Sequence, residues 1–464
     1  MNKQEILSLL ETKKTLIIVG GDQTENAIEI PQFLNGGFIN GNNNKTILCA
    51  EPKRSDVIKL AELVSKQMNE EVGKTIGYGI RFEEKVSTET KIKYITDGLL
   101  IREMMIDPLL NNYSIVIIDQ ANERSLHSDL LLALLNRLQS STRPDLKLII
   151  LTSNNSSAIE FNNFFTRGAT DNNEVSILSL SDQLLLLPSD VTKVVQPEIQ
   201  RCKLTTFILQ LKALNINNLN SFEMITSPST ESINEALNEL FSLGAIITST
   251  KDRSYESSKL TSIGNVMIGL PLDPIYSKII IESEKLGCSE EILTIISMLQ
   301  INRNDLFIGK LPQSLIDNQS DHLTLLNVYN SFVSKNKCSS EQQQWCNDNK
   351  INYKSILAIQ QTKNHLLNFL TKVSIKLLSC ENPQAQDLIK KSILSGFFNN
   401  IAKSVSDDDD DDISYETIVE PTRKVWLHSN SFITTATSQF VLFGQTTKIH
   451  DKEYIKDVSI IDPS

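Results

Sequence analysis

Continuous aliphatic runs, rather than alternating apolar and polar residues, are the main pattern in the first third of the chain. The clearest run lies at residues 113–119, where four aliphatic residues from Ile115 to Ile118 are followed by Asp119. An uninterrupted run of this length is typical of a parallel strand that is buried on both faces of its sheet. The same character predicts strands at residues 16–19, 46–50 and 147–152.

Helical periodicity lies between these strands. Apolar residues recur at the spacing of one helix face at Val57, Leu60, Ala61, Val64 and Met68. The repeated strand–helix order predicts a doubly wound parallel sheet with helices on both faces. In such sheets the chemistry lies beyond the carboxyl ends of the strands. The carboxylate at 119 and the turn after the first strand are therefore the first places to look for a site.

The pattern changes in the second half of the chain. A helix that Ser229 or Thr230 can cap ends at Gly244, and short strands at 245–248 and 259–261 follow it, as in a winged helix. From about residue 275 to 403 the apolar spacing is mostly helical. From about residue 413 onward β-branched and aromatic residues dominate, which suits a small β-barrel.

Composition narrows the classes of function. The 464 residues suffice for about three domains, and 40% apolar residues allow sizeable cores. A net charge of -11 argues against a protein that coats nucleic acid through its overall charge, but it leaves room for a local basic groove. The six cysteines include no C-x-x-C pair, which favours reduced thiols over a disulfide framework or a zinc site. No stretch reaches the ~18 apolar residues of a membrane span.

Gly20 and Gly21 follow the first strand, where a phosphate-binding loop of the form G-x-x-x-x-G-K-[ST] could begin. In that loop the glycines let backbone amides wrap the phosphates, the lysine neutralises them and the hydroxyl holds magnesium. Here Glu25 stands at the second glycine position, Asn26 at the lysine and Ala27 at the hydroxyl. We therefore predict a plain strand-to-helix turn rather than a nucleotide-binding loop.

Five strings occur in a fixed order in the first part of the chain: IPQFL at 30–34, EPKR at 51–54, IGYGIRFEEK at 76–85, YITDGLLIRE at 94–103 and DQANERSLHSD at 119–129. In this order and spacing they resemble the first RecA-like domain of DEAH-box RNA helicases, the spliceosomal type in particular. The resemblance resumes at PEIQR (197–201), LPLDP (270–274), SEKLGCSEEILTI (283–295) and DHLTLLNVY (321–329). It implies that a winged helix, a helical ratchet bundle and an OB-like barrel follow the RecA-like domain.

Pattern and resemblance together predict five segments: a degenerate first RecA-like domain at 1–168, a linker at 169–196, a winged helix at 197–272, a ratchet bundle at 273–390 and an OB-like barrel at 391–464. Members of the family carry a second RecA-like domain where this chain has only residues 155–196, which are too few for one. The family's Q-R-x-G-R-x-G-R run, which carries its arginine finger, is absent from the sequence.

The resemblance also places the family's working residues. Asp119 stands at the magnesium position, Gln120 replaces the neighbouring glutamate, and Asn122 replaces the histidine of the signature. An amide cannot act as a base, and losing one member of a catalytic set can cost nearly as much as losing all of it. We therefore expect no intact catalytic residue, no bound metal and no cofactor, although the family uses ATP and Mg²⁺.

By the same resemblance, contacts with an RNA backbone fall on Lys53, Arg54, Arg81, Thr96 and Asp97. Such contacts need only cations, hydroxyls and amides. The alternative, on an equal footing, is that these residues are solvated surface charges and helix caps. We expect any RNA binding to be weak and strongly dependent on salt.

The sequence thus predicts a catalytically inactive, helicase-like RNA- or protein-binding module related to the pre-mRNA splicing helicases. Its expected partners are RNA and spliceosomal proteins, and no membrane. Two alternatives stay open, an ATP-dependent RNA helicase with residual nucleotide binding and a decaying gene copy. The resemblance suggests the nucleus and leaves the cytoplasm open. The acidic run at 407–412 is expected to be a solvated loop of the barrel.

Overall fold

The computed structural model describes residues 3–37, 45–167, 174–180, 196–219, 221–248, 258–335, 339–380, 384–405, 414–419, 421–433 and 439–462. The chain divides into two compact units. The first comprises residues 1–239 and 248–259, and the second comprises residues 240–247 and 260–464. Each has a hydrophobic core of its own, so the two are described in turn.

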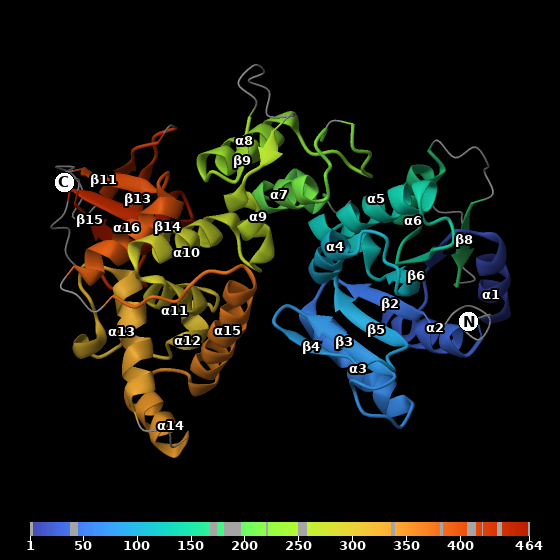
Figure 1. Ribbon diagram of the computed structural model, residues 1–464, viewed down its shortest axis with the longest axis horizontal. Coiled ribbons are helices and arrows are strands. Elements are labelled where there is room, and N and C mark those ends of the chain that lie inside the picture. The colour runs from blue at the N-terminus through green and yellow to red at the C-terminus, as the bar shows by residue number, and fades with distance from the viewer. Residues whose placement is uncertain are drawn as a thin grey trace. The chain divides into compact units, whose positions relative to one another are not determined.

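An eight-stranded sheet organises the first unit (Figure 1). Its strand order is β4-β3-β5-β2-β6-β7-β1-β8, and all neighbouring pairs are parallel except β3 and β4. The strands are β1 (Thr15–Val19), β2 (Thr46–Glu51), β3 (Ile76–Ile80), β4 (Glu83–Lys85), β5 (Ile92–Thr96), β6 (Tyr113–Ile118), β7 (Lys147–Thr152) and β8 (Val175–Ser179). The four aliphatic runs are confirmed as β1, β2, β6 and β7.

Helices cover both faces of this sheet. They are α1 (Lys3–Thr12), α2 (Gln23–Gly37), α3 (Arg54–Gln67), α4 (Asp97–Ile106), α5 (Leu126–Ser141) and α6 (Asn155–Thr166). The first three share one core with alternate strand residues such as Leu16 and Ile47. The intervening residues, such as Ile17 and Leu48, are equally buried and point to the other face, since side chains alternate along a strand. The predicted parallel sheet with helices on both faces is confirmed.

The strand β8 corrects one predicted boundary. We expected residues 169–196 to be a linker, yet β8 pairs in parallel with the full length of β1, from Thr15 opposite Val175 to Val19 opposite Ser179. The β-branched valine and isoleucine of this segment favour an extended strand. Such a strand can pair with the free edge of β1. The sheet therefore extends to residue 179. The other residues of the expected linker, apart from 174, 180 and 196, lie outside the described part of the chain.

The segment that follows belongs to the first unit and packs on its sheet. The backbone amide of Glu198 donates to the carbonyl of Arg124 at 3.0 Å, and its carboxylate accepts from the amide of Leu126 at 2.8 Å. Helix α7 (Thr205–Ala213) follows, and α8 (Thr230–Ser242) crosses the division between the units. The strands β9 (Ile246–Ile247) and β10 (Lys259–Leu260) and helix α9 (Ser262–Gly269) follow. The division of the units falls within residues 197–272, where the winged helix stays a prediction.

The second unit combines a helical bundle with a closed barrel. Its helices are α10 (Pro274–Leu286), α11 (Ser289–Leu299), α12 (Arg303–Leu306), α13 (Asp321–Ser334), α14 (Ser339–Asp348), α15 (Tyr353–Lys372) and α16 (Ala385–Phe397). The barrel strands are β11 (Ile401–Val405), β12 (Ser414–Thr417), β13 (Lys424–Leu427), β14 (Phe440–Ile449) and β15 (Lys452–Ile461), in the order β11-β12-β13-β15-β14 (Figure 1). The predicted succession of bundle and β-barrel is confirmed. The acidic run at 407–412 lies outside the described residues.

Across the described ranges, none of the helices has the length and apolar character needed to cross a bilayer.

Candidate functional site

The turn after β1 uses its own backbone amides instead of presenting them to a ligand. Gly20 and Gly21 adopt φ of 81° and 75°, and α2 begins only two residues later, at Gln23. The carboxylate of Asp22 accepts from the amide of Glu25 at 3.0 Å, and the Asp22 carbonyl accepts from the amide of Asn26 at 2.9 Å. Amides that would wrap phosphates in a nucleotide-binding loop are thus engaged in the first turn of a helix.

The side chain of Asn26 closes the same turn from inside. Its Nδ2 atom donates to the carbonyl of Gly20 at 2.9 Å, and the residue is 7% exposed. A Cβ atom placed on Gly21 would meet the Asn26 carboxamide at 3.2 Å and Leu180 at 3.4 Å. Ala27 is buried in the core, while Glu25 is exposed and adds negative charge beside the turn. The connection is the plain strand-to-helix turn that the sequence predicts.

Carboxylates collect at the carboxyl ends of three adjacent strands. Glu51 ends β2, Asp97 follows β5 and Asp119 follows β6, and these strands lie side by side in the order β5-β2-β6. All three side chains are almost fully buried, and Asp56 of α3 lies close enough to add its charge. Burial, reinforced by the neighbouring carboxylates, raises the pKa of Glu51 well above its ordinary value. Burial likewise raises the pKa of Asp97 to about 7 and that of Asp119 to about 6.

Gln120 bridges this cluster. Its backbone is left-handed, with φ of 50°, and its amide hydrogen-bonds back to the Asp119 carboxylate at 2.7 Å. The side-chain Nε2 atom donates to Glu51 and to Asp56, at 3.3 Å each. A glutamate at this position would place another negative charge against two carboxylates. The uncharged glutamine therefore adds no further repulsion to the acids around it.

The implied magnesium and nucleotide do not fit the residues present. Magnesium in such sites is held by one or two carboxylates together with the phosphates of the substrate. Here the phosphate-loop positions are closed by Asn26, and Asp119 is buried with a raised pKa. Among the described residues no group of three or more His, Cys, Asp or Glu side chains has the arrangement of a metal site. We derive no catalytic step through either group.

Asn122 lies at the position of the histidine in the resembled signature, and its role here is structural. Its Oδ1 atom accepts from Nε2 of Gln23 at 3.1 Å and from the backbone amide of Ser153 at 3.0 Å. These bonds tie the start of α2 and the end of β7 to the turn after β6. The vestigial positions Asp119, Gln120 and Asn122 therefore hold the carboxyl edge of the sheet together.

Arg124 is a residue that the sequence reasoning missed. It is 4% exposed and donates to both carboxylate oxygens of Asp129, at 2.9 and 3.1 Å. Its guanidinium also pairs with Glu160 at 2.5 Å and donates to Oγ1 of Thr226 at 2.8 Å. A buried guanidinium that makes charge-assisted hydrogen bonds to two carboxylates holds their segments firmly together. The signal in the sequence that could have identified Arg124 is its place in the string at 119–129.

Two of the expected RNA-contacting residues share one electrostatic neighbourhood. Loss of surrounding water, together with repulsion from Arg102 and Arg54, lowers the pKa of Arg81 to about 10. The Arg81 guanidinium stacks over the ring of Phe82, 4.7 Å from its centre. Arg102 comes from α4 and was not singled out from the sequence. The three arginines, which we call the arginine cluster (Arg54, Arg81 and Arg102), concentrate positive charge beside the sheet edge.

The other three candidates behave differently. Lys53 is exposed, and its ammonium pairs with Glu123 at 2.6 Å; hydrogen bonding to this carboxylate raises the pKa of Lys53. Thr96 precedes α4, where its side chain makes no capping hydrogen bond. Asp97 is 2% exposed. Its assignment to an RNA contact is corrected, because α4 begins at this residue and turns its carboxyl group into the buried acid cluster.

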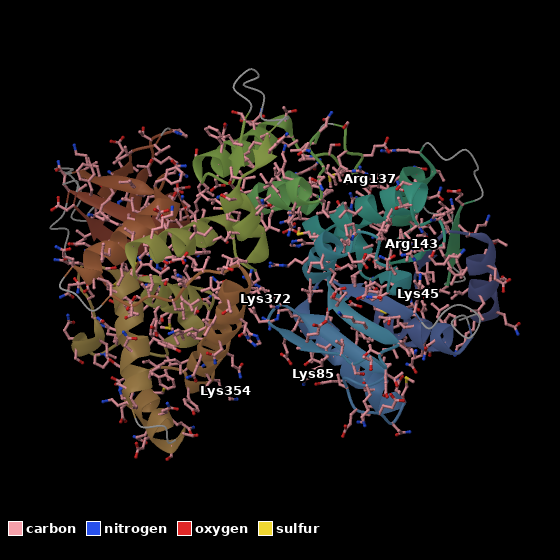
Figure 2. The ribbon with its side chains drawn as sticks, viewed as in Figure 1. Lys45, Lys85, Arg137, Arg143, Lys354 and Lys372 are labelled. Carbon is pink, nitrogen blue, oxygen red and sulfur yellow. The ribbon has the colours of Figure 1, made fainter. Side chains whose placement is uncertain are left out.

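Basic side chains elsewhere are dispersed among the described residues (Figure 2). In the first unit Lys45, Lys85 and Arg143 belong to separate segments, and Arg143 is buried and donates to the backbone carbonyls of residues 109, 110 and 113. In the second unit Lys354 and Lys372 lie at opposite ends of α15. These five cations therefore do not form one patch with the arginine cluster, and a nucleic-acid contact at that cluster would be local.

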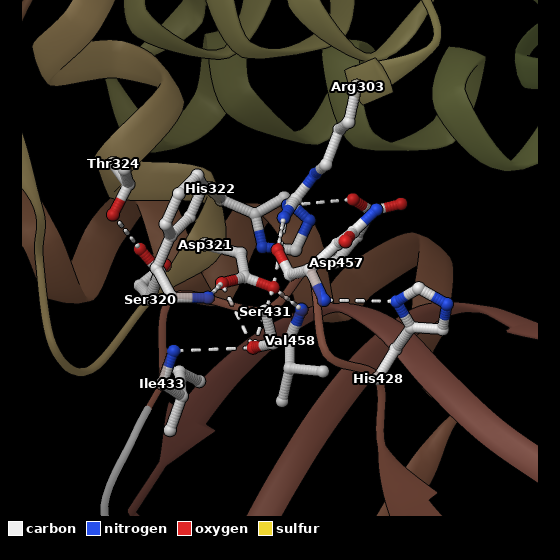
Figure 3. A network of polar contacts seen from close by, with 12 residues as sticks. Arg303, Ser320, Asp321, His322, Thr324, His428, Ser431, Ile433, Asp457 and Val458 are labelled. Atoms are coloured by element: carbon white, nitrogen blue, oxygen red, sulfur yellow. Dashed lines mark hydrogen bonds and ion pairs between the residues drawn. The ribbon is translucent and has the colours of Figure 1, made fainter. Parts of the chain in front are cut away.

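A buried network joins the bundle to the barrel in the second unit (Figure 3). Asp321, at the start of α13, accepts from the hydroxyl of Ser431 at 3.1 Å and from the amides of Phe432 at 2.7 Å and Val458 at 2.9 Å. Arg303 approaches the same carboxylate at 3.4 Å. His322, next along the helix, lies 2.8 Å from the hydroxyl of Ser459 on β15. The two subdomains of this unit are therefore held by charge-assisted bonds as well as by packing.

Comparison with protein families bears on this unit. Residues 273–325 match the helicase-associated domain (HA2), ratchet-like, and residues 389–464 match the oligonucleotide/oligosaccharide-binding (OB) fold. The match with the bundle and barrel defines a helicase-associated carboxyl-terminal region. This pair of domains is typical of the carboxyl-terminal region of DEAH-box RNA helicases. The two matches cover less than a third of the chain.

Proposed function

We propose that this chain is a helicase-like protein that does not hydrolyse ATP and binds single-stranded RNA. The observation that carries the first half is the closed turn after β1, where Asp22 and Asn26 occupy the groups that a triphosphate would need. Phosphoryl transfer depends on cradling the phosphates and on metal ions that neutralise the developing charge. The turn after β1, with its amides bonded to Asp22, does not supply such a cradle.

The match to an oligonucleotide/oligosaccharide-binding fold supports the second half of the proposal. Such barrels bind single strands by combining local positive charge with surfaces for bases. The arginine cluster of the first unit supplies a further backbone contact in this proposal, because guanidinium groups recognise phosphates well. We expect modest affinity that falls steeply with salt, in keeping with the net charge of -11.

Calorimetry with ATP and Mg²⁺, together with phosphate release in the presence and absence of RNA, tests the first half. We expect neither heat of binding nor turnover. Turnover that Asp119→Ala abolishes would overturn the proposal, because it would show that the vestigial magnesium position still works. A contaminating ATPase is recognised because Asp119→Ala would leave its activity unchanged.

Fluorescence anisotropy with a short single-stranded RNA tests the second half. Charge reversal of Arg54 and Arg81 should weaken binding and flatten its salt dependence. Lys59→Glu is the matched control, because Lys59 is an exposed cation on α3, the helix that Arg54 begins. Equal weakening by the control and by the double variant would remove the arginine cluster from the RNA-binding surface.

We further propose a place among the RNA-processing proteins of the nucleus, on the strength of the strings that resemble spliceosomal helicases. Affinity purification of the tagged chain from nuclear and cytoplasmic extracts tests this. Recovery with splicing proteins would support it. Recovery from the cytoplasm alone, without splicing proteins, would overturn it.

A further inference from the structure

The second unit contains a polar cavity of about 320 Å³ where the helical bundle meets the barrel. Its walls come from the end of α11 and from α12 on one side, and from the loop after β13 and the β14–β15 hairpin on the other. The cavity is at the small end of the ~300–1,000 Å³ range of small-molecule sites. It has room for one nucleotide-sized ligand rather than for a stacked run of bases.

A break in the β14–β15 ladder shapes one wall of this cavity. Lys456 and Asp457 both line it, although consecutive residues of a regular strand point to opposite faces. Asp457 adopts φ of 55°, and Gly444 and Asp457 do not pair, although the register is the same on both sides of them. Gly444 makes this possible, because a Cβ there would lie 3.0 Å from that of Asp457.

The two cations of the cavity have different roles. Arg303 is held in place, with Nη2 at 2.8 Å from the carboxylate of Asp457 and Nη1 donating to the carbonyl of Asn430 at 3.0 Å (Figure 3). Lys456 is half-buried and has no ion pair among the described residues. Burial, and then the positive charges of Lys456 and Arg303, lower the pKa of nearby His428. Lys456 is therefore the cation of the lining that a ligand can pair with, since Arg303 already faces the carboxylates of Asp321 and Asp457.

The rest of the lining combines buried apolar residues with paired amides. Met298 and Leu325 lie behind the cavity wall and are each 1% exposed. At the rim, Nδ2 of Asn430 donates to Oδ1 of Asn304 at 3.0 Å. This bond leaves one amide donor and one carbonyl acceptor free for a ligand. A donor and an acceptor side by side are what a carboxamide uses to read the edge of a nucleobase.

We propose that this cavity binds a single unpaired nucleotide of an RNA strand, with its phosphate at Lys456 and its base edge at Asn304 and Asn430. The proposal rests on the proposed RNA-binding function and gives it a location. Arg303, which already faces Asp321 and Asp457, fixes the shape of the wall instead of binding phosphate.

Binding of the full chain to a labelled single strand of about eight uniform nucleotides, within the range of OB-fold site sizes, tests the phosphate contact. Lys456→Met keeps the aliphatic stem and removes the charge. Its log–log salt slope should be shallower than that of the natural chain by about 0.7, the value for one phosphate of a single strand. Lys448→Met is the matched control, an exposed lysine on the same hairpin, and its slope should not change.

The base contact is tested with Asn304→Ala and with an abasic strand of the same length. The natural chain should bind the normal strand more tightly than the abasic one, and Asn304→Ala should reduce this preference. The residue is exposed at the rim, so the variant should fold, which tryptophan fluorescence from Trp426 can verify.

The outcomes separate the two proposals. Absence of RNA binding by the natural chain at low salt would overturn the proposed function and this site with it. RNA binding that Lys456→Met leaves with an unchanged salt slope would overturn the site alone. Equal affinity for normal and abasic strands would show a phosphate contact without a base pocket, and it would equally overturn the proposal.

Discussion

Replacing Asp97 by asparagine should stabilise the first unit, and the gain should grow with pH. The Asp97 carboxyl is 2% exposed, and burial, with Asp119 nearby, raises its pKa from 3.8 to about 7. A carboxyl with a raised pKa holds its proton more tightly in the folded than in the unfolded chain. The folded state therefore loses stability as pH rises from about 4 to about 7, and the loss is complete above that range.

The size of the effect follows from the two pKa values. At 1.36 kcal/mol for each tenfold change, the rise from 3.8 to about 7 corresponds to about 4 kcal/mol at full ionisation. Between about pH 6 and about pH 8.5 the folded carboxyl gives up a proton that the unfolded one has already lost. The advantage of Asp97→Asn should therefore increase by about 1 kcal/mol across this interval. Any constant cost of the amide cancels from this difference.

The assay must report on the first unit alone. Both tryptophans, Trp345 and Trp426, lie in the second unit, so their fluorescence does not follow the unfolding of the sheet. Pulse proteolysis in urea, with mass spectrometry of peptides from residues 45–167, measures it directly. Glu89→Gln, at an exposed position of the first unit, is the control and should give no advantage that grows with pH. An advantage of Asp97→Asn that stays constant, or that shrinks as pH rises, would refute the reasoning about the buried acid cluster.

Three further changes probe the rest of the chain. Asp321→Ala should destabilise the second unit by about 2–6 kcal/mol, because the buried amides of Phe432 and Val458 lose their acceptor at about 1–3 kcal/mol each, while Arg303 keeps its pair with Asp457. An exposed position should cost at most about 0.5 kcal/mol. Urea unfolding followed by tryptophan fluorescence measures this, and near-neutral behaviour would contradict it. Burial lowers the pKa of His322 from 6.5 to about 4, so the stability of that unit should fall as pH drops through this range, and His322→Gln should flatten the fall in the same assay. Asn26→Lys should not create ATP binding, since Asp22 still occupies the amides of the first helical turn; a measurable calorimetric affinity would show that the turn opens.

Aliphatic continuity predicted the strands that are buried on both faces and missed those with polar residues. The strand β5 is as deeply buried as β2, but it contains Lys93, whose ammonium pairs with Glu84 and Glu103 at 2.7 Å each. A buried, paired lysine interrupts an apolar run without weakening the strand. The strand β8 is short and lies at the sheet edge, and its pairing with β1 is what identifies it as a strand. Such strands depend on contacts far along the chain.

The candidate site, too, was only partly predictable from the sequence. That Gln120 cannot serve as a base is evident from its chemistry alone. Its bridging of Glu51 and Asp56 is not, since those residues precede it by 69 and 64 positions and only the parallel order of the strands brings them together. The burial of Asp97 likewise follows from where α4 starts and not from its neighbours in sequence.

Arg124 connects three segments that are far apart in the sequence. The same guanidinium holds Asp129 at the start of α5 and Thr226 in the segment beyond the sheet, while its backbone carbonyl receives the amide of Glu198. Arg124 is also only five residues from Asp119. The residues around Glu198 and Thr226 are thus bonded through this one arginine to the turn that follows β6 and to the start of α5.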